Sequence, residues 1–159
     1  MMLDGIGYLD LEDDPELAKA QGLLAQWDFT ADGQGPADAL AVMVLGEAMR
    51  KSYGLNPPPD PRETLAKAVA HLTQHFGRID PPLGDVLRLR QGSVDLPMLG
   101  GSDTLRAASL WDEQPDGRLA VKHGDSFIML IRWDKDGTLT SESIQPYGAA
   151  TSRENNFLT

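Results

Sequence analysis

Residues 127–133, Phe-Ile-Met-Leu-Ile-Arg-Trp, most strongly constrain the fold of this chain, because they are apolar at nearly every position. A strand of this kind is typical of a sheet that is covered on both faces. The next four residues, Asp134-Lys135-Asp136-Gly137, are a hairpin turn signal, and residues 138–144 alternate between polar and apolar side chains. The sequence therefore predicts a hairpin whose first strand needs neighbouring layers.

Three helices are expected before the strands, over residues 14–27, 36–53 and 60–76. Each begins at a proline, and in the first and third an aspartate precedes that proline as an N-cap. The third also carries Glu63 at its third position and Gly77 just beyond its end, which completes its start and stop signals. Apolar side chains recur at helical spacing in all three, at Leu17, Ala20, Leu24 and Trp27, at Leu40, Met43, Val44 and Ala48, and at Leu65, Ala68, Val69, Leu72 and Phe76.

Composition changes at Asp80, after which the segments are short and rich in Gly, Pro and Asp. Residues 118–123 alternate and predict one further strand. Helices followed by strands indicate an α+β fold. We expect one partial domain over residues 1–159, with a helical part over 14–77 and a loop and strand part over 80–153.

Charge and composition exclude several classes of function. The net charge of −10 argues against binding nucleic acid or an anionic membrane surface, since both need clustered Lys and Arg. The chain has no cysteine, which excludes disulfides, thiolate catalysis and Cys-ligated zinc. Its longest apolar run is too short to span a bilayer, and its start has no signal-peptide core, which indicates the cytoplasm if the chain is free-standing.

His71 and His75 stand four residues apart on the third predicted helix and could share a metal ion. The zinc-protease motif needs Glu directly after the first His, where this chain has Leu72. No third ligand is indicated. We therefore expect two polar side chains on the flank of a helix and no metal site; a metal-dependent hydrolase is kept as an alternative.

Other motifs predict turns and core positions rather than chemistry. His123-Gly124-Asp125-Ser126 has the residue types of a nucleophilic triad, but triad members meet through folding and not through adjacency. Gly100-Gly101-Ser102-Asp103-Thr104 fits no phosphate-binding fingerprint, and Asp134 with Asp136 lacks the final Glu of a calcium loop. The three tryptophans are expected to be core or interface anchors: Trp27, Trp111 and Trp133.

Several blocks, in a shared order, carry a resemblance to a known family. They are residues 23–28 (Leu-Leu-Ala-Gln-Trp-Asp), 75–84 (His-Phe-Gly-Arg-Ile-Asp-Pro-Pro-Leu-Gly), 94–107 (from Val-Asp-Leu-Pro through Gly-Gly-Ser-Asp-Thr-Leu), 123–129 and 145–153. Together they resemble the C-terminal part of the β chain in the penicillin acylase and acyl-homoserine-lactone acylase family. Members of that family are N-terminal-nucleophile amide hydrolases.

The resemblance implies a periplasmic precursor that cleaves itself into α and β chains and folds as an αββα sandwich. A Ser at the new β-chain terminus attacks the amide, and its own α-amino group is the base. Backbone N–H groups and an Asn stabilise the oxyanion. The substrate is an acyl amide, such as an acyl-homoserine lactone, a penicillin or a lipopeptide, and no cofactor is implied.

None of those functional positions falls within this chain, so we expect no catalytic residue and no metal ligand here, and the substrate-binding residues are not indicated. The chain is expected to be a fragment that needs the rest of the α and β chains, is inactive alone, and exposes apolar surface when isolated. The alternative is a non-enzymatic module that binds a partner through an apolar sheet face.

Overall fold

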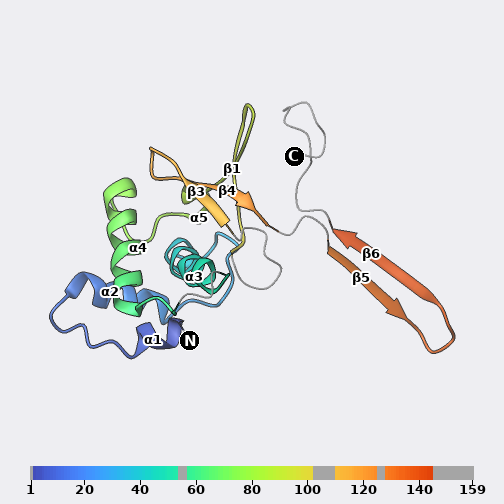
Figure 1. Cartoon of the computed structure of the whole chain (residues 1–159), viewed down its shortest axis with the longest axis horizontal. Coiled ribbons are helices and arrows are strands. Elements are labelled where there is room, and N and C mark those ends of the chain that lie inside the picture. Colours follow the sequence, from blue (N-terminus) through green and yellow to red (C-terminus); the bar gives the residue numbers. More distant parts are fainter. Residues whose placement is uncertain (1, 54–56, 102–109, 125–127, 145–159) are drawn as a thin grey trace.

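The computed structural model describes residues 2–53, 57–101, 110–124 and 128–144 (Figure 1). Within these ranges the chain is α+β, as the sequence predicts. The strands β1, β3 and β4 lie beside the helices, and the β5–β6 hairpin lies apart from them (Figure 1). None of the described helices combines the length and apolar character that crossing a bilayer requires. The helices are α1 (Met2–Gly7), α2 (Pro15–Leu24), α3 (Asp38–Tyr53), α4 (Pro61–Phe76) and α5 (Leu83–Val86). The strands are β1 (Leu87–Gln91), β2 (Val94–Pro97), β3 (Leu110–Glu113), β4 (Leu119–His123), β5 (Ile128–Trp133) and β6 (Leu139–Ile144).

The α4 helix confirms its predicted start and stop. The Asp60 carboxylate accepts the backbone N–H of Glu63 at 2.9 Å, and Gly77 ends the helix in the left-handed conformation at φ 70°. α2 also begins as predicted, with Asp14 accepting the N–H of Leu17 at 3.1 Å. It ends at Leu24, however, before the predicted Trp27.

The start of α3 departs from the prediction, because Asp38 and not Pro36 is its first residue. Asp38 is fully buried, and its Oδ2 accepts the backbone N–H groups of Gly33 at 2.9 Å and Gly35 at 3.2 Å. Its Oδ1 accepts the indole N–H of Trp27 at 3.1 Å, and that N–H is shared with the carbonyl of Thr30 at 2.7 Å. This carboxylate therefore fixes the loop between α2 and α3.

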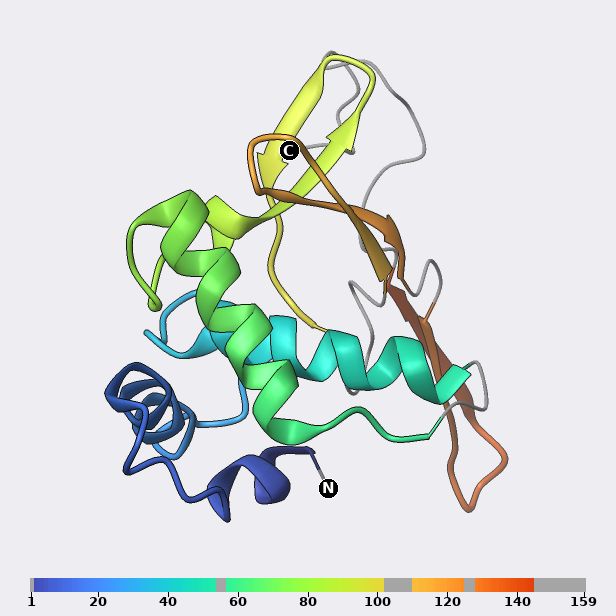
Figure 2. The same ribbon diagram turned by 60° about the vertical axis from the view of Figure 1, so that its left-hand side comes forward.

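The core lies between α3, α4 and the first helices. α3 and α4 cross beside each other (Figure 2). α1 packs at the first turn of α4, where Gly5 lies against Pro61, and α2 packs beside its later turns, where Thr73 donates to Glu16. α1 was not predicted, because six residues carry too little helical periodicity to be recognised; Ile6 anchors it in the core. The most buried large side chains are Ile6, Leu40, Leu65, Leu72, Leu83 and Leu87.

A four-stranded mixed sheet, in the order β2-β1-β4-β3, packs on these helices. Only β4 was predicted, so the expectation of three helices and one hairpin is wrong in this region. β1 and β2 are joined by a two-residue turn in which Gly92 has φ 59°, and β1 pairs in parallel with β4. β1 does alternate, with Leu87 and Leu89 buried and Arg88 and Arg90 less buried on the other face, but it is too short for the alternation to be recognised in the sequence.

β5 and β6 form a second sheet of their own, and Figure 1 shows this hairpin projecting away from the helices. Its bounds agree with the predicted strands, and among the described strands each pairs only with the other. Phe127, the first residue of the predicted strand, lies outside the described residues.

The sheet meets α3 at one close contact. Gly46, in the middle of α3, is buried against the indole ring of Trp111 on β3. A Cβ atom at Gly46 would overlap that ring. The glycine therefore lets the tryptophan approach the helix backbone.

We predict that Asp38→Ala destabilises the protein by about 2–4 kcal/mol, because it removes the acceptor of the Gly33 and Gly35 N–H groups and one of the two acceptors of the Trp27 indole N–H. Asp38→Asn is expected to be nearly as damaging, since its NH₂ group would face donors. Urea unfolding measures both. The control is Asp32→Ala, because the exposed Asp32 carboxylate accepts a single loop N–H. This substitution is expected to lower the free energy of unfolding by about 0.5 kcal/mol or less. Equal effects at the two positions would contradict the role given to Asp38.

Gly46→Ala is predicted to destabilise by about 1–3 kcal/mol, although alanine favours an exposed helix by about 1 kcal/mol over glycine. The loss comes from the overlap of the new methyl group with Trp111. In a Trp111→Leu background the same change should be neutral or stabilising, which a double-mutant cycle measures. An additive cycle would show that the two residues do not contact each other.

Candidate functional site

The β5–β6 hairpin carries the largest exposed apolar side chains of the described sheets. Its register pairs Met129 with Ser143, Ile131 with Ser141 and Trp133 with Leu139, which places these side chains on one face. Their exposed fractions are 48% for Met129, 45% for Ile131, 69% for Trp133 and 58% for Leu139. Apolar surface of this extent on a single face is typical of a docking surface. We refer to Met129, Ile131, Trp133 and Leu139 as the hairpin face.

The opposite face of the hairpin is mixed. It carries Leu130, Arg132, Thr140 and Glu142, whose side chains are also exposed. β6 is polar at four successive positions, 140–143, whereas β5 is apolar along most of its length. Charged and polar strands are typical of sheet edges, so β5 is the strand better suited to receive another strand.

The residues between β5 and β6 form a hairpin turn, as predicted. The N–H of Gly137, at φ 87°, bonds the carbonyl of Asp134 at 3.0 Å. Asp136 accepts the N–H of Thr138 at 2.9 Å, and this bond holds the pKa of the Asp136 carboxyl below its usual range. Asp134 forms an ion pair with Arg132 at 2.8 Å. Both carboxylates are thus engaged within the hairpin.

A second exposed apolar surface lies between α1 and α2. Tyr8 is 90% exposed and Phe29 is 75% exposed, and the two help to line a shallow hollow with Leu3 and Leu24. Phe29 also has a left-handed backbone at φ 65°, which is rare for an aromatic residue. Strained, exposed aromatic residues of this kind are frequent at binding surfaces.

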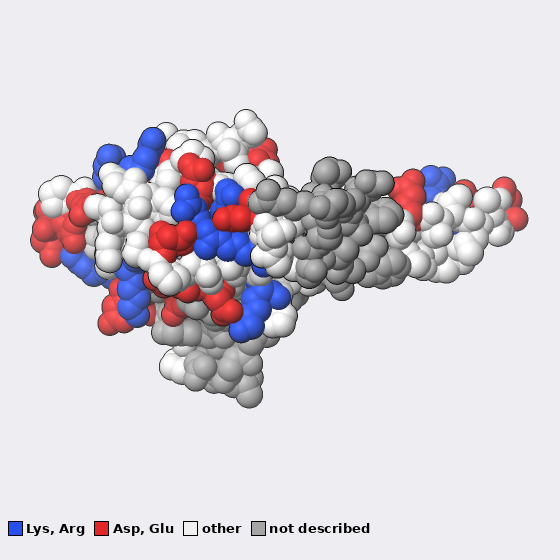
Figure 3. Space-filling model, turned by 90° about the horizontal axis from the view of Figure 1, so that it is seen from above, with Lys and Arg blue, Asp and Glu red and all other residues white. Residues whose placement is uncertain are grey.

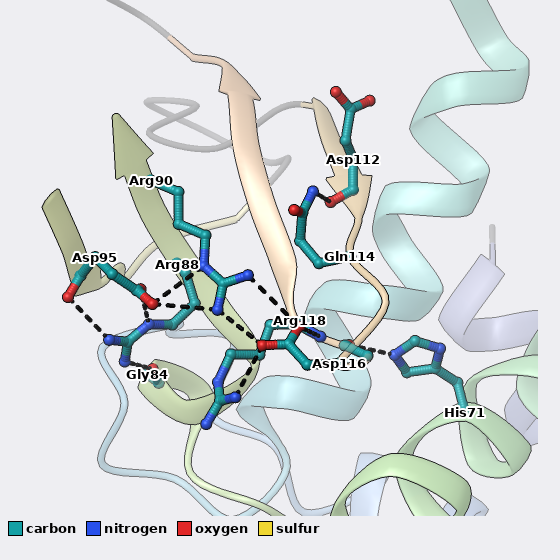
Figure 4. A network of polar contacts seen from close by, with 10 residues as sticks. His71, Gly84, Arg88, Arg90, Asp95, Asp112, Gln114, Asp116 and Arg118 are labelled. Carbon is teal, nitrogen blue, oxygen red and sulfur yellow. Dashed lines mark hydrogen bonds and ion pairs between the residues drawn. The ribbon is translucent and has the colours of Figure 1, made fainter. Parts of the chain in front are cut away.

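Acidic and basic side chains are interleaved on one face of the body (Figure 3). Figure 4 shows the network that joins β1 and β2 to the β3–β4 turn. The Asp95 carboxylate forms ion pairs with Arg88 at 2.7 Å and with Arg90 at 3.1 Å. Arg90 also forms an ion pair with Asp116 at 2.9 Å. Asp116 in turn forms an ion pair with Arg118 at 3.0 Å. Each of the two carboxylates is bonded by two guanidinium groups within the network, which indicates a structural role.

These ion pairs lower the pKa values of both carboxyl groups, Asp95 and Asp116. Arg90, with the N–H and guanidinium of Arg118, holds the pKa of Asp116 well below its usual range. Arg88 and then Arg90 lower the pKa of Asp95 in the same way. Both groups are stabilised in their charged form, so they contribute to stability above the pKa of an unfolded aspartate and lose that contribution as the pH falls.

The two histidines of α4 meet the same turn. His71 and His75 lie with ring centroids 4.7 Å apart, and the Nε2 of His71 is 2.8 Å from the carbonyl oxygen of Gly117. Glu113, the last residue of β3, brings its Oε1 to 3.5 Å from the Nδ1 of His71. The sequence indicated no third ligand beside the histidines, but the fold supplies a carboxylate.

The remaining candidate residues are not brought together as a site by the described structure. His123 ends β4, while Asp125 and Ser126 lie outside the described residues, as do Ser102, Asp103 and Thr104. Trp27 is buried in the core, as predicted. Trp111 contacts α3, and Trp133 is exposed on the hairpin face.

No model of a known protein family matches this chain.

We predict that Asp116→Asn lowers the stability at pH 7 by about 1 kcal/mol or less, because Asp116 is partly exposed and its ion pairs are screened by water. The difference from wild type should shrink as the pH falls below about 4, because the unfolded wild type then takes up a proton at Asp116 that the folded state, with its lowered pKa, does not yet bind. Urea unfolding at several pH values measures it. Asp32→Asn is the control for loss of one exposed charge. A difference that stays constant with pH would contradict this prediction.

Proposed function

We propose that this chain is a scaffold segment of an amide hydrolase that acts on small acyl amides, such as acyl-homoserine lactones, penicillins or lipopeptides. The proposal rests on the resemblance to the β chain of N-terminal-nucleophile acylases and on one structural observation. That observation is the hairpin face, which presents four large apolar side chains without a covering layer among the described residues.

The hairpin fits such a role because its two strands differ. β5 is apolar enough to lie inside a larger sheet, while the polar side chains of β6 suit an edge. In an αββα sandwich the hairpin face would be covered by a second layer from the remaining α and β chains. The nucleophilic Ser, its α-amino base and the oxyanion groups would belong to those parts of the enzyme, in the periplasm.

A non-enzymatic binding module is the second candidate. The observation that favours it is the core formed by α1 to α5 with β1 and β4, in which the buried apolar side chains form one continuous cluster. A body with its own core can present the hairpin face to a separate partner protein. The two candidates share the docking surface and differ in whether the assembled complex hydrolyses amides.

The test is co-expression of this chain with the polypeptide encoded directly upstream in its genome. We expect a complex that releases the free amine from N-acyl-homoserine lactones or penicillin G, and no turnover by the chain alone. The Ile131→Thr/Trp133→Thr variant should weaken the complex at least tenfold and reduce hydrophobic dye binding, because it removes two apolar anchors and keeps a residue favoured in strands.

The matched control is Leu130→Thr/Arg132→Thr, which changes the same strand on its opposite face and should leave the complex intact. A stable complex without amide hydrolysis would replace the hydrolase proposal with the binding module. Turnover by the isolated chain would contradict the scaffold role, and so would equal loss of the complex in both variants.

A further inference from the structure

We infer that His71, His75 and Glu113 form a binding site for a divalent transition-metal ion, of which Zn²⁺ is the best match. The ligand atoms of the three residues all lie within 4.8 Å of one another. Two come from successive turns of α4 and the third from the end of β3, so an ion bound here would join the helices to the sheet. This inference is independent of the proposed function.

The hydrogen bond of His71 prepares it for a metal. The carbonyl of Gly117 can only accept, so the Nε2 that lies 2.8 Å away carries the proton. In the neutral ring Nδ1 then has no proton and carries a lone pair. This nitrogen lies 3.5 Å from the Oε1 of Glu113. Two acceptors at this distance need a cation between them. A backbone carbonyl that orients a histidine in this way is the usual outer partner of a metal ligand.

The separation of the His71 nitrogen and the Glu113 oxygen also suits zinc. With bonds of about 2.0–2.2 Å and tetrahedral angles, a histidine nitrogen and a carboxylate oxygen on one Zn²⁺ lie about 3.4 Å apart. The observed separation of 3.5 Å between His71 Nδ1 and Glu113 Oε1 is close to that value. Imidazole nitrogens favour zinc, cobalt, nickel and copper over magnesium and calcium.

The surroundings hold the two histidines in place and leave one side of the site open. The ring of His75 packs so closely on Gly117 that a Cβ at Gly117 would overlap it, and Gly117 needs glycine for its φ of 78° as well. His71 is 11% exposed, whereas Glu113 is 61% exposed and reaches solvent. A water molecule can therefore supply the fourth ligand, as in zinc sites with three protein ligands.

A proton can take the place of the metal, since a protonated His71 would form an ion pair with Glu113. Titration of the chelator-treated full chain with ZnCl₂ in a calorimeter at pH 7.5 distinguishes a metal site from a simple ion pair. We expect one equivalent to bind, and a rise in Tm of roughly 5 °C or more when free Zn²⁺ exceeds Kd a hundredfold. Co²⁺ in the same site should give the intense visible absorption of a tetrahedral complex.

Glu113→Gln and His75→Gln are the informative variants, because both keep roughly the size of the side chain and leave His71, with its bond to the Gly117 carbonyl, unchanged. Each should weaken Zn²⁺ binding at least tenfold and abolish the Co²⁺ absorption. His123→Gln, a histidine elsewhere on β4, is the control and should bind as wild type does. Absence of Zn²⁺ binding in the wild type would overturn the site, and so would unchanged binding in Glu113→Gln or His75→Gln.

Discussion

The buried carboxylate of Asp38 is the constraint on which the helical body depends. One charged group at the first residue of α3 receives the indole N–H of Trp27 and the backbone N–H groups of Gly33 and Gly35. A charge in this position is tolerable because donors surround it and the positive end of the helix dipole lies beside it. α3 is thereby fixed against the end of α2, and its apolar side chains meet α4 and the sheet.

α4 connects the helices to the sheet, because it contacts both. Its first turn lies near α1, its middle packs on α3, and its last turns place His71 and His75 against the β3–β4 turn. The same turn is held from its other side by Asp116, through Arg90 and Arg118. The position of Glu113 beside the histidines is therefore set by a well-supported turn, which is the requirement for preorganised ligands. The hairpin has no such support and relies on β5–β6 pairing among the described residues.

Local signals identified much of the fold. Asp60, Pro61 and Gly77 predicted both ends of α4, because capping depends on residues that are neighbours in sequence. The Asp134–Gly137 turn predicted the β5–β6 hairpin for the same reason. The prediction failed where elements are short: for α1, and for the β1–β2 hairpin, where Gly92 marks the turn but the alternation over Leu87–Gln91 is too short to identify a strand. It also placed the start of α3 at Pro36, since nothing local shows that Asp38 would be buried with three donors.

The sequence by itself determined the fold class, the ends of α4 and the apolar character of β5, because each depends on residues that are adjacent or one turn apart. Only the tertiary structure decided which residues meet across the chain. It placed Glu113 beside His71, brought Trp111 against Gly46, and separated the apolar face of the hairpin from its mixed face through the β5–β6 register. These contacts join residues that are distant in sequence, and no local pattern encodes the path of the backbone that brings them together.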